Sequence, residues 1–62
     1  MVCIGTTKEV KGMAREFSRL GYEVETTKET VKITDDGVFV YTALLKGDST
    51  WIVRYDSKYF GG

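Results

Sequence analysis

The chain lacks histidine and proline, contains one cysteine, and carries no net charge. Without histidine, Ser-His and Cys-His catalytic pairs and imidazole metal sites are excluded. Cys3 cannot form an internal disulfide, and secreted domains of this size usually carry several, so we expect a reducing compartment. Nine Lys and Arg balance nine Asp and Glu, so no global field draws the protein toward nucleic acid or an acidic membrane. An electrostatic partner would have to recognise a local patch.

Long apolar runs, linkers and repeats are missing as well. No uninterrupted apolar stretch approaches the ~20 residues of a membrane span, and residues 1–10 show no basic leader followed by an apolar run. We therefore expect a cytoplasmic protein that makes no membrane contact. We also expect a single domain over residues 1–62. A chain of this length buries only about 60% of the surface that its unfolded form exposes, so its core has to be efficient.

The strongest local pattern predicts a helix over about residues 7–20. Thr6 followed by Glu9 fits a capping box, in which a hydroxyl and a carboxylate satisfy backbone N–H groups at the helix start. Gly21 supplies the left-handed residue that ends the helix. At about 100° per residue, five apolar side chains share one side of this helix and should face the core. They are Val10, Met13, Ala14, Phe17 and Leu20.

Four runs rich in β-branched and aromatic residues follow the helix and predict strands. Asp36-Gly37 is typical of a two-residue type I′ hairpin turn, and Gly47-Asp48 of a type II′ turn. Lys28-Glu29 is a weaker turn. The predicted strands cover about residues 22–27, 30–35, 38–45 and 50–56, and residues 57–62 form a tail.

This order predicts an α+β fold in which one N-terminal helix packs on a four-stranded antiparallel meander, with residues 1–4 as a short extra edge strand. The order is similar to that of the cystatin-type fold. The glutamine-containing inhibitory loop motif of cystatins is not present, so protease inhibition is not implied. Gly61-Gly62 resembles the tail of ubiquitin-like modifiers and sulfur carriers, but those proteins have two strands before the helix. We interpret the two glycines as a frayed end.

Regular pairing outward from these turns divides the strand at residues 38–45 between two faces. Val40, Thr42 and Leu44 then face the helix. Large apolar side chains also fall on the opposite face, where Lys32 and Arg54 lie on either side of Tyr41. The predicted apolar strip on that outer face consists of Phe39, Tyr41, Ala43, Leu45 and Ile52.

Nothing in the sequence predicts catalysis. Cys3 lies in an apolar stretch and is expected to be packed rather than nucleophilic. Asp35 and Asp36 precede a glycine as a hairpin turn requires. The glycines occupy turns and helix ends, so no phosphate-binding loop is predicted. We expect no enzyme activity, no cofactor and no metal.

The outer strip is the most informative feature, because leaving it in water would forgo several kcal/mol in a domain with only about 5–15 kcal/mol in total. Three coverings remain open: the chain's own tail through Tyr59 and Phe60, a second copy or another protein, or unpaired bases stacked on Phe39 and Tyr41. We favour a regulatory or binding module that acts through protein–protein contact, with Tyr41→Glu abolishing association and preserving the fold. The candidate protein-binding residues are Phe39, Tyr41, Leu45, Ile52, Lys32 and Arg54.

A second candidate function is nucleic-acid binding, because four basic residues lie on the helix opposite its apolar side. They are Lys8, Lys11, Arg15 and Arg19. The simpler interpretation is a solvated helix face flanked by Glu9 and Glu16. Regulators of phages and other mobile elements are often this small, an association that rests on no particular residue.

Overall fold

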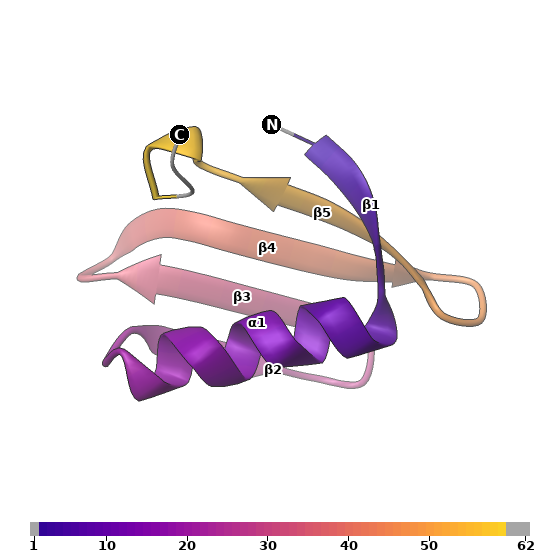
Figure 1. Ribbon diagram of the computed structural model, residues 1–62, viewed down its shortest axis with the longest axis horizontal. Coiled ribbons are helices and arrows are strands. Elements are labelled where there is room, and N and C mark those ends of the chain that lie inside the picture. Colours follow the sequence, from indigo (N-terminus) through magenta and orange to yellow (C-terminus); the bar gives the residue numbers. More distant parts are fainter. Residues whose placement is uncertain (1, 60–62) are drawn as a thin grey trace.

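The computed structural model describes residues 2–59 and confirms the predicted α+β fold, with one helix packed on an antiparallel sheet (Figure 1). The elements are β1 (Val2–Thr6), α1 (Thr7–Arg19), β2 (Glu23–Thr26), β3 (Thr30–Asp35), β4 (Val38–Lys46), β5 (Thr50–Tyr55) and a 3-10 turn, η1 (Ser57–Tyr59). The sheet order is β1-β5-β4-β3-β2, so the N-terminal segment is a fifth strand at one edge. Helical segments within residues 2–59 lack the length and apolar character that a membrane span requires.

The capping box that starts α1 is present. The Thr6 N–H donates to Glu9 Oε1 at 3.0 Å, and the Glu9 N–H donates to Thr6 Oγ1 at 3.2 Å. The helix ends with Gly21 at φ 95, a conformation that glycine adopts without strain. The Tyr22 N–H then donates to the Phe17 carbonyl at 3.1 Å, which closes the last turn.

Helix α1 lies over β2 and β3 on one face of the sheet, which we call the inner face (Figure 1). Val10, Ala14 and Phe17 are buried there. The sequence prediction that Leu20 belongs to this apolar side is wrong, because its side chain is 65% exposed at the C-cap, after the last helical residue. Tyr22 takes its place, with its ring 4.9 Å from that of Phe17 in an edge-to-face arrangement.

Strand β4 contains a β-bulge that the sequence prediction missed. Asp35 pairs with Val38 and Thr34 with Phe39, as the Asp36-Gly37 turn dictates. The next pair is Ile33 with Tyr41, so Val40 is an extra residue opposite β3. Beyond the bulge every side chain of β4 points to the face opposite the one predicted. The inner face receives Tyr41, Ala43 and Leu45, while Thr42 and Leu44 point outward.

The loop between β4 and β5 restores the predicted orientation of β5. A two-residue turn at Gly47-Asp48 would pair Lys46 with Ser49, but Lys46 pairs with Thr50, so the loop has three residues. Gly47 adopts φ 77 within it. This one-residue shift cancels that of the bulge. Residues 51, 53 and 55 therefore face the helix as predicted, although their partners on β4 differ.

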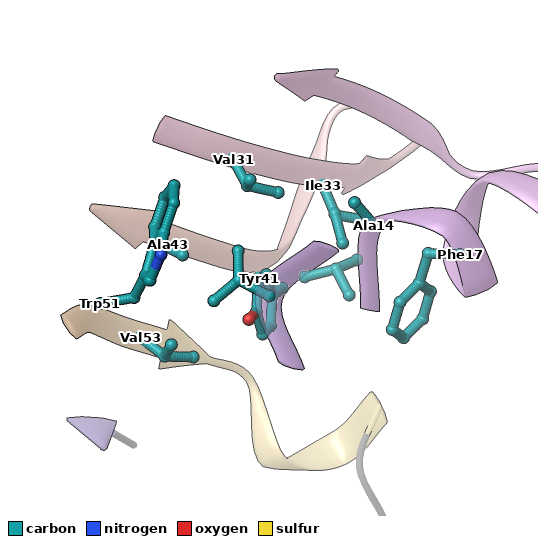
Figure 2. Close-up of a cluster of buried hydrophobic side chains, with 10 residues drawn as sticks. Ala14, Phe17, Val31, Ile33, Tyr41, Ala43, Trp51 and Val53 are labelled. Carbon is teal, nitrogen blue, oxygen red and sulfur yellow. The ribbon is translucent and has the colours of Figure 1, made fainter. Parts of the chain in front are cut away.

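The core lies between α1 and the inner face (Figure 2). Tyr41 is only 4% exposed and sits among the buried aliphatic side chains of β3, β5 and α1. The indole of Trp51 donates a 2.9 Å hydrogen bond from Nε1 to Thr7 Oγ1, at the start of the helix. This bond joins β5 to α1 while the rest of the indole stays buried.

Candidate functional site

Two cross-strand rows of side chains lie at the centre of the exposed, outer face of the sheet, since antiparallel partners share a face. The apolar row runs from the edge strand through Ile4, Ile52 and Leu44 to Thr30. Ile4 is 72% exposed and Leu44 47% exposed. The basic row consists of Arg54, Thr42 and Lys32, with Val2 at one end and Glu25 at the other.

The outer face is hollowed over β3, β4 and β5. The hollow has a volume of about 350 Å³, and both rows line it. Leu44 and Ile52 form an apolar side, Lys32 and Arg54 a cationic side, and the Thr42 hydroxyl lies between the two cations. Such a surface can take an apolar side chain and a carboxylate from the same partner, because each finds its chemical counterpart within one hollow.

The structure places four of the six predicted protein-binding residues on this outer face. Lys32, Arg54 and Ile52 line the hollow, and Phe39 lies beyond it, beside Thr34, at 41% exposure. The prediction was wrong for Tyr41 and Leu45, which the bulge directs to the inner face. Their places are taken by Thr42 and Leu44.

Covering by the tail, one of the three possibilities that the sequence left open, is not found among the described residues. Tyr59 packs against the core from the inner side, where its ring lies 6.3 Å from that of Tyr22. Its backbone N–H donates to the Asp56 carbonyl at 3.0 Å in the turn of η1. Phe60, Gly61 and Gly62 lie outside the described residues.

Val2 and Ile4 were missed as part of this face. The sequence predicts residues 1–4 as a short extra edge strand. It does not indicate which strand of the sheet they pair with. Pairing of β1 with β5 places both side chains on the outer face. The alternation of Val2, Ile4 and Thr6 is the signal that could have found them, since period-two patterning indicates a strand with one solvated face.

Cys3 is exposed, so the expectation that it is packed was wrong. It pairs with Val53 on the inner side of β1 and borders an apolar groove of about 260 Å³ between α1 and the sheet. Met13, Tyr41 and Tyr55 line the same groove. Within residues 2–59 no three side chains of the His, Cys, Asp or Glu type gather as a metal site would require.

The four basic residues of α1 are all exposed, at positions that share one helix face. Arg19 Nη1 lies 3.7 Å from Glu16 Oε2, so part of this charge is neutralised. Lys11 also lines a groove with Lys28, from the loop between β2 and β3. The structure thus brings Lys8, Lys11, Arg15 and Arg19 together, although on the opposite side of the molecule from the hollow.

We expect the free energy of unfolding to fall in alkaline solution because Tyr41 is buried. Burial, with smaller contributions from Cys3 and Glu9, raises the pKa of the Tyr41 phenol to about 12. An unfolded tyrosine ionises near pH ~10, so its contribution to stability is complete below that pH and lost as the pH rises toward about 12. Urea titrations over this range should show a falling free energy of unfolding, with a shallower fall in Tyr41→Phe. Equal slopes would contradict the buried phenol.

Comparisons with protein-family models, with curated proteins and with solved structures found no match to this chain.

Proposed function

We propose that the chain is a small non-catalytic binding or regulatory module that acts through protein–protein contact on the outer face of its sheet. The observation that carries this proposal is the hollow over β3–β5, where Leu44 and Ile52 lie beside Lys32 and Arg54. Interfaces typically combine such an apolar centre with a charged rim. The small size of the domain adds weight, because exposed apolar side chains on a sheet face contribute little to its own stability.

The side chains that line the hollow indicate which chemical groups its partner should carry. Two cations on either side of Thr42 in one row favour a carboxylate, and the neighbouring apolar row favours an aliphatic or aromatic side chain. We expect a protein segment that presents both groups a few ångströms apart. Glu25, next to Lys32, limits the net positive charge of the face and disfavours a polyanion such as nucleic acid at this site.

Substituting one leucine tests the proposal against a matched control. Leu44→Glu places a carboxylate inside the hollow, whereas Leu20→Glu makes the same change on an exposed residue at the far end of α1. Immobilised wild-type protein and Leu20→Glu are expected to retain one protein in stoichiometric amount from the source cell extract, and Leu44→Glu to lose it. Arg54→Glu should weaken retention, because it removes a partner for the carboxylate. Equal retention by all variants would overturn the proposal.

Nucleic-acid binding through α1 is the second candidate, and the groove shared by Lys11 and Lys28 favours it, since it extends the basic helix face. The aromatic version of this candidate loses one of its two rings, because Tyr41 is buried and only Phe39 stays exposed on the outer face. The helix version predicts binding of a single-stranded oligonucleotide that weakens steeply with salt. It also predicts that Lys11→Glu/Arg15→Glu abolishes binding in fluorescence anisotropy. An absence of binding by the wild type at low ionic strength would exclude this candidate.

A further inference from the structure

The two edges of the sheet differ in chemistry. Edge strand β2 carries Glu23 and Glu25 in four residues, and such charges protect an edge against pairing with other chains. The opposite edge, β1, reads Val-Cys-Ile-Gly-Thr and carries no charge and no proline. In the described part of the chain no strand lies beyond β1. This edge therefore remains open to a further strand.

The capping box determines which backbone groups of β1 face outward. The Thr6 N–H donates to Glu9 Oε1, so it does not point toward β5. N–H and C=O groups alternate in direction along an antiparallel strand. By this alternation Val2 and Ile4 direct their backbone groups away from β5, toward the open edge. Thr6 itself contributes little there, because its N–H is taken and, as the N-cap, its C=O accepts the first helical hydrogen bond.

We propose that two copies of the chain pair through β1, antiparallel, around a two-fold axis at Cys3. This register places Val2 opposite the second copy's Ile4, and Ile4 opposite the second copy's Val2, so that both pairs exchange backbone hydrogen bonds. An axis at Ile4 would instead require the occupied groups of Thr6. The edge is thus self-complementary in one register, which is what an isologous dimer needs.

The side chains of β1 fit this register. On the outer face it joins Val2 and Ile4 with their copies in one apolar cluster, continuous with Ile52 and Leu44. On the inner face it places the two Cys3 residues directly opposite each other. Nine basic and nine acidic residues per chain leave no net repulsion between the copies. Three described residues on each side, Val2 to Ile4, pair in this register and form a small interface, so we expect a dissociation constant on the order of 100 μM.

This inference goes beyond the proposed function, since it concerns the edge of the sheet and a second copy as partner. The dimer is a continuous ten-stranded sheet, because each copy contributes the five strands of its own sheet. Its outer face carries two copies of the hollow. A symmetric partner could then occupy both at once and gain affinity from two linked contacts.

Crosslinking through the natural cysteine tests the register. Opposed residues of a non-hydrogen-bonded antiparallel pair have Cα atoms about 4.5 Å apart, within the range of a disulfide. With added copper–phenanthroline and oxygen, two Cys3 thiols lose two protons and two electrons to the oxidant and form one S–S bond. The product runs at twice the 7.0 kDa of one chain on a non-reducing gel. In Cys3→Ser/Ile4→Cys the new thiol lies opposite Val2 instead, so this dimer band is expected to be lost. Equal crosslinking of both proteins, or of neither, would overturn the register.

A charge exchange supplies a second test that needs no oxidant. Val2→Lys/Ile4→Lys places like charges opposite each other and is expected to keep the mass at 7.0 kDa in sedimentation equilibrium up to millimolar concentration. Val2→Lys/Ile4→Glu places opposite charges at both symmetric positions and should restore twice that mass. A wild type that stays at 7.0 kDa, or a Val2→Lys/Ile4→Lys variant that still dimerises, would overturn the dimer.

The Leu44→Glu variant separates this inference from the proposed function, because Leu44 lies on β4, two strands away from the paired edge. It is expected to dimerise like the wild type while losing its protein partner. A monomeric wild type whose partner is lost on Leu44→Glu would overturn the dimer and leave the docking face standing. If the wild type dimerises and the Leu44→Glu variant still binds the protein partner, the docking face would be overturned and the dimer would stand.

Discussion

Tyr41→Glu is expected to unfold the protein. With regular pairing of β3 and β4, Tyr41 would lie on the outer face and the variant would fold. The Tyr41 side chain lies on the inner face, between Ile33 and Tyr55 in its cross-strand row. An ionised carboxylate at this depth costs several kcal/mol, and the lost apolar burial adds about 1.5–3 kcal/mol. A small domain has a total stability near the lower end of about 5–15 kcal/mol, so most of the variant should be unfolded at 25 °C. Circular dichroism and a urea titration measure this directly.

The neighbouring residue provides the control for Tyr41→Glu. Thr42 points outward between Lys32 and Arg54, so Thr42→Glu adds a carboxylate in water next to two cations. Its free energy of unfolding should stay within about 1 kcal/mol of the wild type. If Thr42→Glu unfolded and Tyr41→Glu remained folded, β4 would have the regular register and the bulge would be refuted.

Phe17→Ala is expected to lower the free energy of unfolding by about 3–5 kcal/mol. Phe17 is buried where α1 meets the sheet, and its ring packs edge-to-face on Tyr22. Its removal leaves a cavity and also deprives Tyr22, and behind it Tyr59, of their support. Urea denaturation followed by tyrosine and tryptophan fluorescence gives the value.

Phe39→Ala makes the same change on the outer face, where the ring is already 41% exposed and faces solvent beside Thr34. We expect a loss below about 1 kcal/mol, because little buried surface disappears. Similar losses for the two variants would mean that the outer face is covered by part of the protein itself. That result would remove the basis of the proposed docking face.

Local signals in the sequence were sufficient for the fold class. The capping box at Thr6 and Glu9, the stop at Gly21 and the hairpin turn at Asp36-Gly37 each depend on neighbours within a few residues. Asp36 at φ 53 and Gly37 at φ 83 show the two positive angles that a type I′ turn requires. Such features can be predicted because no distant contact is needed to form them.

The register of β4 could not be predicted, because residues 38–45 contain apolar or small side chains on both alternations. Either phase buries a plausible set, so the hydrophobic pattern does not specify the pairing. What decides it is tertiary packing: the bulge lets both Val40 and Tyr41 be buried, at 0% and 4% exposure. The sequence has no glycine and no turn-forming residue around Val40, so no local signal indicates the extra residue of the bulge.

The candidate site was predicted only in part, because the prediction of its residues depends on the register of β4. Lys32, Arg54 and Ile52 lie on strands whose faces were predicted correctly, and all three line the hollow. Tyr41 and Leu45 lie beyond the bulge, so Thr42 and Leu44 replaced them. The contribution of β1 depends on its pairing with β5, a contact between residues about fifty positions apart that no local pattern encodes.

The assignment of side chains to the outer face rests on the register of β4, and one NMR measurement tests it most directly. The Leu45 N–H donates to the Glu29 carbonyl at 2.8 Å, and alternation from there makes Lys32 and Thr42 a non-hydrogen-bonded pair with closely spaced α-protons. A nuclear Overhauser spectrum in D₂O should show a strong contact between the α-protons of Lys32 and Thr42. A contact from the Lys32 α-proton to that of Tyr41 instead would restore regular pairing and contradict the outer face described above.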